Sequence, residues 1–270
     1  MDSLVAMTTE FWQSVSGPGE QRLLKMLSYG LAGSMVLATV ITRFVGIPYG
    51  RYYSAAFGFV VPARLAWLVQ ELPAFLVPLH LALCSGGARM HAWPNRILLG
   101  LFLIHYTYRA LIFPFLIRGG KPTPASLFLL AFLFCSFNGY LQGRPLSNYT
   151  VFPAYWIKDA RFVIGTAMWL SGLLINIQSD DILRNLRKPG ETGYKIPRGG
   201  MFEYVTGANY FGEIVEWFGF ALASCTLQSA AFAFSTLLIL GRRAQQHHAW
   251  YLNKFEDYPR SRKILIPFLY

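Results

Sequence analysis

Long apolar runs constrain the fold of this chain more than any other feature of its sequence. They occupy residues 23–41, 59–83, 97–117, 125–141, 162–177 and 209–240. Most are close to the roughly 20 residues that a helix needs to cross a bilayer. The last run is too long for one untilted span, and its polar break C-T-L-Q-S near Gln228 indicates two helices in a tight hairpin. Because lipid offers no partner for backbone N–H and C=O groups, we predict an all-α integral membrane protein with about seven transmembrane helices.

The composition fits a single membrane domain over residues 1–270. Hydrophobic residues make up 54% of the chain and charged residues only 14%, so a multi-pass protein in contact with the lipid bilayer is expected. The net charge of +11 suits anionic headgroups or an anionic ligand. No nucleic acid partner is expected, because the cations lie between apolar runs and form no continuous basic face. No obligate protein partner is indicated.

The sequence contains none of the common motifs for metal, nucleotide or hydrolytic sites. The three cysteines lie far apart in apolar surroundings, so no disulfide framework and no metal site are predicted. Adjacent His247 and His248 cannot share one face of a helix. There is no G-x-G-x-x-G after a strand, no G-x-x-x-x-G-K-[ST] and no H-E-x-x-H.

One polar stretch, residues 176–200, stands out from its apolar surroundings. It carries five lysines and arginines with several glycines and two prolines, and it joins one apolar helix to the next. Asn176, Asp180 and Arg184 recur in it at helical spacing, although Asp180 and Arg184 alone would make an ordinary i,i+4 pair. The next helix repeats this spacing at Asn209, Glu213, Glu216 and Trp217. Amides and carboxylates suit ribose hydroxyls and a carboxamide, and cations suit phosphates, so we predict a ligand site here.

Ionisable groups inside the second and third runs indicate a second site. Charges at membrane depth are costly and usually face a cavity or a partner. One interpretation of Glu71 is a structural ion pair with Arg64, on the same helix face, or with Arg109. The other is that Glu71 lies in an apolar pocket as a neutral acid and donates a hydrogen bond to a substrate. Tyr106, which lies mid-run between a histidine and an arginine, is a second candidate donor.

The distribution of cations predicts the orientation in the membrane. With seven spans, the positive-inside rule places residues 176–200 and the C-terminus in the cytosol. The sequon Asn148-Tyr-Thr then lies on the opposite side, where glycosylation is possible.

Six segments of the chain match a known family in the same order. They are P-A-R-L-A-W-L-V-Q-E-L-P, L-I-H-Y-T-Y-R, N-G-Y-L-Q, L-L-I-N-I-Q-S-D-D-I-L-R-N-L-R-K-P-G-E-T-G-Y-K-I-P-R-G-G, E-Y-V-T-G-A-N-Y-F-G-E-I-V-E-W and F-E-D-Y-P-R-S-R-K-I-L-I-P-F. These runs resemble the steroid 5-alpha-reductase family, and its type 1 branch most of all. By this resemblance residues 46–270 form the catalytic region, and residues 1–45 form a variable tail and first helix.

The resemblance implies an activity, a cofactor and a location. The family reduces the 4,5 double bond of 3-oxo-4-ene steroids with NADPH, in a seven-helix membrane fold around a cofactor and substrate cavity. Its steroid-side pair falls on Glu71 and Tyr106. These two catalytic residues are expected to hydrogen-bond the 3-keto oxygen of the steroid while hydride reaches carbon 5. The expected location is the endoplasmic reticulum membrane of a eukaryote or the inner membrane of a bacterium.

The resemblance also implies a cofactor-binding set. It comprises Tyr49, Arg109, Asn176, Asp180, Arg187, Tyr194, Asn209, Glu213, Trp217, His247 and Tyr251, with Lys121, Arg184, Lys195 and Arg243 as weaker candidates. The sequence departs from the family pattern at Gln178 and Asp181, both near the cofactor stretch. The finer contacts of that stretch are therefore left open.

The sequence leaves three alternatives to steroid reduction. One is a reductase of the same fold that acts on another enone or on an enoyl lipid. Another is a membrane methyltransferase of related architecture, which would bind S-adenosylmethionine. The third is a non-catalytic sterol-binding membrane protein, which would not need Asn176, Asp180, Asn209 and Glu213 together.

Overall fold

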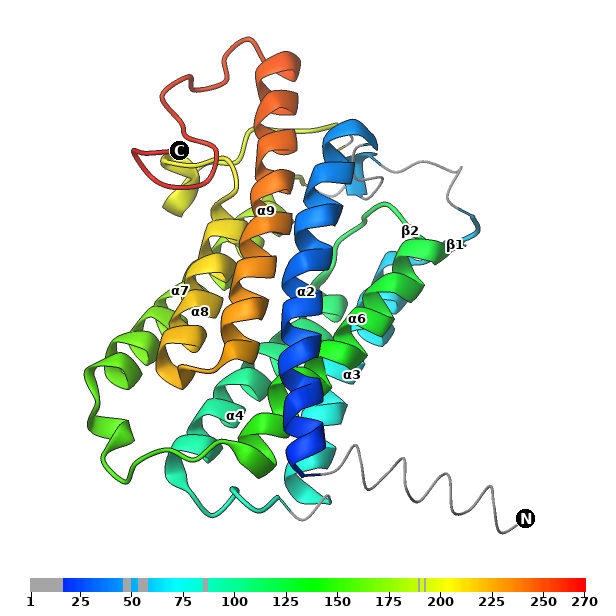
Figure 1. The fold of residues 1–270 in the computed structure, drawn as a ribbon. Coiled ribbons are helices and arrows are strands. Elements are labelled where there is room, and N and C mark those ends of the chain that lie inside the picture. Colours follow the sequence, from blue (N-terminus) through cyan, green and yellow to red (C-terminus); the bar gives the residue numbers. More distant parts are fainter. Residues whose placement is uncertain (1–16, 46–49, 53–57, 85–86, 189, 192) are drawn as a thin grey trace.

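The regular structure of this computed structural model is almost entirely helical (Figure 1). It describes residues 17–45, 50–52, 58–84, 87–188, 190–191 and 193–270. The main helices are α2 (Pro18–Val45), α3 (Ala63–Leu83), α4 (Trp93–Tyr106), α5 (Phe113–Leu116), α6 (Ala125–Arg144), α7 (Ala160–Asn185), α8 (Ala208–Ser224) and α9 (Leu227–Lys254). Short helical turns occupy Gly50–Tyr52, Thr107–Ile112, Pro145–Tyr149, Trp156–Lys158 and Gly200–Glu203. Two short strands, β1 (Val60–Val61) just before α3 and β2 (Thr123–Pro124) just before α6, form an antiparallel pair.

The helix lengths confirm an all-α membrane fold but change the number of candidate spans. Within the described residues, five segments are long and apolar enough to cross a membrane: Pro18–Phe44, Ala63–Leu83, Trp93–Leu116, Ala125–Tyr149 and Ala160–Asn185. The prediction was about seven. With 17 residues, α8 is about 25 Å long, short of the roughly 30 Å of a hydrocarbon core. α9 has 28 residues but is polar beyond Leu240. The predicted break in the last apolar run is confirmed between Ser224 and Leu227.

α7 and α8 pack antiparallel with their backbones almost touching, because glycines line the contact. A Cβ added at Gly172 would lie 2.3 Å from the backbone nitrogen of Glu216, and one added at Gly219 would lie 2.4 Å from that of Trp169. Within a bilayer, where lipid tails are as apolar as leucine, such close approach is a main source of helix association.

The other long helices complete the bundle around this pair. α3 packs along α6, and α2 and α8 pack along α9 (Figure 1). One end of α2 is fixed by Glu20, which accepts hydrogen bonds from Tyr140, Tyr149 and Arg144. The other end is fixed where Arg242 donates to the carbonyl of Thr42, at 3.1 Å. α2 is therefore held at both ends.

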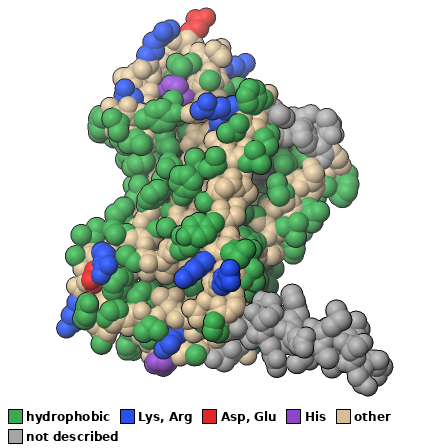
Figure 2. Space-filling model, viewed as in Figure 1, with side chains coloured by type: hydrophobic (Ala, Val, Ile, Leu, Met, Phe, Trp, Pro, Cys, Tyr) green, Lys and Arg blue, Asp and Glu red, His purple; other side chains and the backbone are tan. Residues whose placement is uncertain are grey.

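The surface matches the apolar sequence runs. In Figure 2 hydrophobic side chains cover the central part of the visible face, and most charged side chains gather towards its two ends. Large exposed side chains such as Leu37 and Phe44 of α2 face outward, as expected where the surroundings are lipid.

The sequon residue Asn148 is only partly exposed, and its side-chain oxygen accepts a hydrogen bond from the Ser147 hydroxyl at 2.6 Å. Its glycosylation stays a prediction.

The glycine contact predicts that a single methyl group will destabilise the bundle. We expect Gly172→Ala to lower the free energy of unfolding by about 1–3 kcal/mol, because the new Cβ overlaps backbone that cannot move independently. The matched control is Gly33→Ala in α2, where an added Cβ meets no atom within 4 Å. Thermal unfolding of the detergent-solubilised protein measures both variants. Equal midpoints for the two would contradict the proposed role of the contact.

Candidate active site

A π-helical turn, Thr107–Ile112, follows α4 and carries ionisable side chains into the bundle. π turns of this kind occur often at functional sites. His105 and Tyr106, at the end of α4, are buried. The guanidinium of Arg109 lies over the rings of Trp67 and Phe113, with its central carbon 4.8 and 4.6 Å from the ring centres. These cation–π contacts fix the arginine within the apolar bundle.

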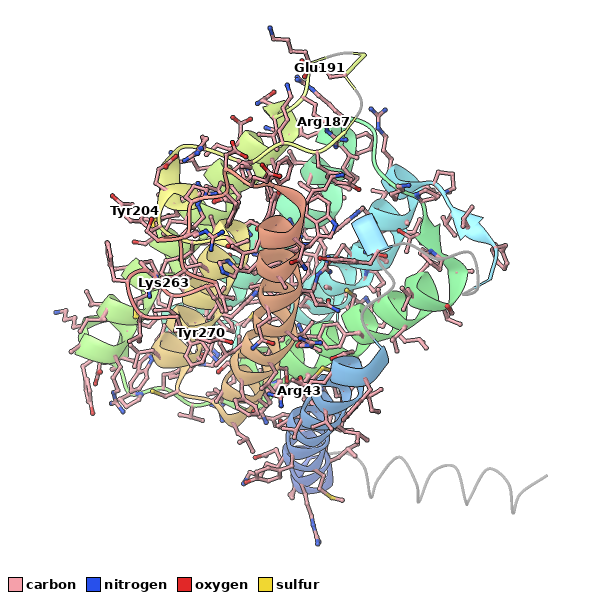
Figure 3. All side chains as sticks on the ribbon, turned by 90° about the horizontal axis from the view of Figure 1, so that it is seen from above. Arg43, Arg187, Glu191, Tyr204, Lys263 and Tyr270 are labelled. Atoms are coloured by element: carbon pink, nitrogen blue, oxygen red, sulfur yellow. The ribbon has the colours of Figure 1, made fainter. Side chains whose placement is uncertain are left out.

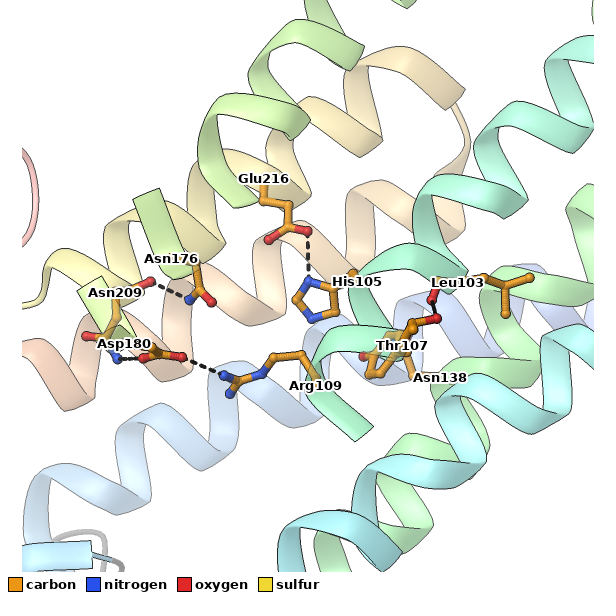
Figure 4. A network of polar contacts seen from close by, with 10 residues as sticks. Leu103, His105, Thr107, Arg109, Asn138, Asn176, Asp180, Asn209 and Glu216 are labelled. Atoms are coloured by element: carbon orange, nitrogen blue, oxygen red, sulfur yellow. Dashed lines mark hydrogen bonds and ion pairs between the residues drawn. The ribbon is translucent and has the colours of Figure 1, made fainter. Parts of the chain in front are cut away.

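Arg109 joins α7 and α8 in one polar network (Figure 4). Its Nη1 donates to Oδ2 of Asp180 at 3.0 Å, and the side-chain amide of Asn209 donates to the other Asp180 oxygen at 3.5 Å. The side-chain amide of Asn176 donates to the backbone carbonyl of Asn209 at 2.9 Å. Four residues of the predicted cofactor set therefore lie together, held by the close contact of α7 with α8.

The two predicted steroid-side residues lie against neighbouring turns of α6. The Cys135 thiol donates to Oε2 of Glu71 at 3.6 Å. The side-chain amide of Asn138 donates to the Tyr106 hydroxyl oxygen at 3.5 Å, and Gln142 in turn donates to Asn138 at 3.2 Å. Since Cys135 and Asn138 are three residues apart on one helix face, α6 brings Glu71 and Tyr106 into one region.

The structural interpretation of Glu71 as half of an ion pair is wrong. Arg64 instead donates to the backbone carbonyl of Ile117, at 2.9 Å from Nη2. Arg109 pairs with Asp180 and acts on Glu71 only as a nearby charge. The Glu71 carboxyl group is thus left with the weak Cys135 donor among the described residues, and it remains available to a ligand.

Glu213 of α8 connects the two predicted sites. It is partly buried, and its charge acts on Glu71 of one site and on Arg109 and Asp180 of the other. The Glu71–Tyr106 region and the Asn176–Asp180 region are therefore close enough to share the electrostatic influence of Glu213.

His105 and Glu216 form a buried pair that the sequence analysis did not assign. Nδ1 of His105 lies 2.7 Å from Oε1 of Glu216, and both residues are almost fully buried. The Trp217 ring packs edge-on against His105, with ring centres 4.6 Å apart. The sequence analysis also did not assign Asn138 and Gln142, which hold the Tyr106 hydroxyl. Their i,i+4 spacing within an apolar run is the signal that could have found them.

The basic loop after α7 is organised by short-range charge pairs. Lys195 pairs with Glu191, which also accepts the backbone N–H of Lys188 at 2.8 Å. The Lys195 ammonium holds the pKa of Glu191 below its usual range. Arg187 donates to the carbonyl of Gly193 at 3.4 Å and lies over the Tyr194 ring. In Figure 3 Arg187 and Glu191 of this loop lie at one edge of the molecule.

Arg184 takes a different partner from the one that its spacing indicates. It pairs with Asp181 rather than with Asp180. Asp180 turns into the bundle towards Arg109, while Asp181 is exposed. The departure from the family at Asp181 therefore lies on the outer face of α7. Gln178, the other departure, lies beside Gly200, where an added Cβ would be 3.1 Å from its Oε1.

The C-terminal candidates lie in an aromatic cluster on α9. Nε2 of His247 lies 3.0 Å from the Tyr210 hydroxyl, and the His247 ring is stacked between the rings of Tyr52 and Tyr210. Arg243 lies over the same Tyr210 ring. Tyr251 is buried and stacks on Tyr258. The Tyr194 ring reaches this cluster through Trp250.

One described member of the predicted cofactor set does not join these contacts, and another cannot be placed. Lys121 is exposed in the loop before β2, outside the network described above. Tyr49 lies outside the described residues.

Comparison with known proteins identifies the family. The model of the family described as 3-oxo-5-alpha-steroid 4-dehydrogenase matches residues 121–270. 3-oxo-5-alpha-steroid 4-dehydrogenase 1 of Bos taurus is 59% identical over 253 residues, which cover 93% of this chain and 98% of the relative. This chain belongs to the 3-oxo-5-alpha-steroid 4-dehydrogenase family. The proteins of the same name from Rattus norvegicus and Macaca fascicularis are 59% and 56% identical, and cover 92% and 93% of this chain and 95% of each relative.

Several buried polar atoms of this family member lack a hydrogen-bond partner among the described residues. Those beside the site include Oδ1 of Asn176, Oε2 of Glu216 and Nε1 of Trp217. All three belong to the α7–α8 pair. A buried polar atom without a partner costs about 1–3 kcal/mol, and a ligand that contacted these atoms would offset that cost.

The Arg109–Asp180 pair makes a testable prediction about stability. We expect Arg109→Met to lower the free energy of unfolding by about 3–5 kcal/mol, because it leaves Asp180 charged and unpaired in the bundle. The double variant Arg109→Met/Asp180→Leu should recover most of that loss. Thermal unfolding measures both variants, with Lys195→Met in the exposed Lys195–Glu191 pair as the control that leaves the midpoint unchanged. A double variant no more stable than Arg109→Met would contradict the prediction.

Proposed function

We propose that this protein reduces the 4,5 double bond of 3-oxo-4-ene steroids of the testosterone or progesterone type, with NADPH as the reductant. The names of its relatives support a steroid substrate. The observation that carries the proposal is the placement of Glu71 and Tyr106 against neighbouring turns of α6. Two hydrogen-bonding groups directed into one apolar region suit a single carbonyl oxygen.

Tyr106 is set up as a donor by its own neighbour. Its hydroxyl oxygen accepts the N–H of Asn138, so its proton is left for a substrate oxygen. Asn138 is held in turn by Gln142, which also donates to the backbone carbonyl of Gln228 at 3.1 Å. A donor that is already oriented needs no rearrangement when charge develops on the substrate, and this is how such groups lower a barrier.

The chemistry follows from where charge moves in an enone. Hydrogen bonds from Tyr106 and from a protonated Glu71 to the 3-keto oxygen draw electrons along the enone and make carbon 5 electrophilic. NADPH, when bound, supplies the hydride to that carbon. The same two donors stabilise the resulting enolate oxygen until carbon 4 takes a proton. The rings of Phe102 and Trp217 pack beside Tyr106 and keep water from its side of the site, which strengthens its hydrogen bond.

The residues of the α7–α8 pair fit the cofactor. The unpartnered Oδ1 of Asn176 and Nε1 of Trp217 are an acceptor and a donor, as a carboxamide requires. Asp180 and Asn209 present oxygens and an amide suited to ribose hydroxyls. We assign the phosphates to the loop cations, chiefly Arg187, because guanidinium groups bind phosphate oxygens in pairs.

The relatives also bear on the location. They come from mammals, which favours the endoplasmic reticulum membrane over a bacterial inner membrane, with the C-terminus in the cytosol as the cation distribution predicts. Protease protection of a C-terminal tag in intact microsomes tests the orientation, and loss of the tag is the expected result.

Turnover of testosterone with NADPH tests the two proposed donors. We expect Glu71→Leu and Tyr106→Phe each to reduce kcat about 10²–10³-fold, the usual cost of one lost donor to a developing oxyanion. Tyr155→Phe, an exposed tyrosine, is the matched control and should turn over normally. Wild-type rates in Glu71→Leu and Tyr106→Phe would exclude the mechanism. A substrate panel with other enones and enoyl lipids tests the alternative of a different substrate.

Calorimetric titration tests the cofactor separately. The wild-type protein should bind NADPH and not S-adenosylmethionine, and the reverse result would indicate a methyltransferase. We expect Asn176→Leu to weaken NADPH binding by about 1–3 kcal/mol, roughly 5- to 150-fold, because it removes a buried amide partner. Gln21→Leu, an exposed amide at the far end of α2, should leave the dissociation constant unchanged. Binding of steroid without either cofactor would indicate a sterol-binding protein.

A further inference from the structure

Residues 264–270, here called the C-terminal turn, are held in a defined shape by backbone hydrogen bonds. The carbonyl of Tyr270 accepts the N–H groups of Leu265 and Ile266 at 2.7 and 2.6 Å, and the N–H of Tyr270 donates to Ile266 at 3.0 Å. Just before the turn, Lys263 is joined to the backbone of Tyr204 and Thr206. The turn is therefore a fixed part of the fold.

This turn displays large apolar side chains on the outside of the protein. Phe268 and Leu269 are 79% and 75% exposed, and Ile266 and Tyr270 are about 40% exposed. The ring of Phe268 packs on exposed Tyr204, with centres 5.2 Å apart. Phe268 also has a φ of 64°, a conformation that bulky residues rarely adopt. The fold thus holds an aromatic side chain outward in a strained conformation, at a cost that needs a compensating contact.

The turn lies at the level where the bundle changes from apolar to polar. Buried Leu265 packs in a cluster with Leu240 of α9, and an added Cβ at Gly241 would lie 3.8 Å from its side chain. The next residue of α9, Arg242, reaches the carbonyl of Thr42 near the end of the apolar helix α2. In Figure 1 the turn lies at the same end of the bundle as the end of α2. This level corresponds to a membrane–water boundary.

Exposed cations accompany the apolar turn. Lys263 and Arg260 are exposed, and viewed from above Tyr204, Lys263 and Tyr270 lie on the same side of the molecule (Figure 3). Aromatic and aliphatic side chains next to lysine and arginine are the composition of membrane-interface segments, in which the rings enter the headgroup region and the cations meet anionic lipid.

We propose that the C-terminal turn is a membrane-interface anchor. It inserts Phe268 and Leu269 among the lipid headgroups of the leaflet on the C-terminal side, and Lys263 and Arg260 contact anionic lipid there. The anchor fixes the height of α8 and of the start of the polar half of α9 relative to the bilayer. The inference depends on the contacts of this turn and not on the identity of the cofactor or of the steroid.

Nitroxide labels on the full-length protein in lipid nanodiscs test this proposal. The exposed cysteines Cys84 and Cys225 are first replaced by serine, and labels are attached at Phe268→Cys or Leu269→Cys. The collision rate of each label with oxygen, which concentrates in lipid, is compared with that of a water-soluble nickel chelate. Leu37→Cys, on the outward face of α2, is the lipid reference, and Glu256→Cys, exposed beyond α9, is the water reference.

We expect the oxygen-to-nickel ratio at positions 268 and 269 to lie between the two references. It should shift further towards oxygen when phosphatidylserine is added to phosphatidylcholine nanodiscs, and this added shift should disappear with Lys263→Gln/Arg260→Gln. A ratio equal to that of the Glu256→Cys label would overturn the proposal. Shielding of the label from both reagents would also overturn it, since that indicates a protein partner or a second copy of the chain on this surface.

Discussion

The near contact between the backbones of α7 and α8 is the constraint on which the rest of the site depends. Gly165, Gly172, Gly212 and Gly219 leave no side chain between the two helices. Lipid provides no hydrophobic force to hold two apolar helices together, so this close approach and the polar contacts that it permits supply the association. Because the helices touch, Asn176 reaches the backbone of Asn209 across the contact. A wider separation would leave both amides without partners.

The buried ionisable groups of the bundle are costly, and their arrangement indicates why they are retained. Arg109 and Asp180 form an ion pair, and His105 is hydrogen-bonded to Glu216. Such pairs contribute little net stability compared with apolar residues of the same size. These contacts instead position the helices. Arg109 holds the π turn after α4 against α7, and His105 holds the end of α4 against α8. His105 and Arg109 lie on either side of Tyr106 in the sequence, and the Tyr106 hydroxyl itself is held by Asn138 of α6.

The proposed division of the site follows the polarity of the bundle. The cations of the basic loop lie at the polar end of the molecule, where a phosphate group remains hydrated. Glu71 and Tyr106 lie between helices that are long and apolar enough to cross a membrane, where a steroid partitions readily. The charge of Glu213 acts on both regions, so the two regions lie near each other in the bundle.

The sequence by itself determined the features that depend on neighbours in the chain. Apolar runs of bilayer length predicted the helices and the break after Ser224, because hydrogen bonding within lipid leaves few other structures. Polar residues in apolar runs also marked Glu71 and Tyr106. Only the tertiary structure decided which residues these polar side chains interact with. Asp180 pairs with Arg109, 71 residues away, and not with nearby Arg184, and Glu71 lies against Cys135 rather than pairing with an arginine. Helical spacing states which residues share a face, but the near contact of α7 with α8 and the packing of α3 on α6 decide what that face meets.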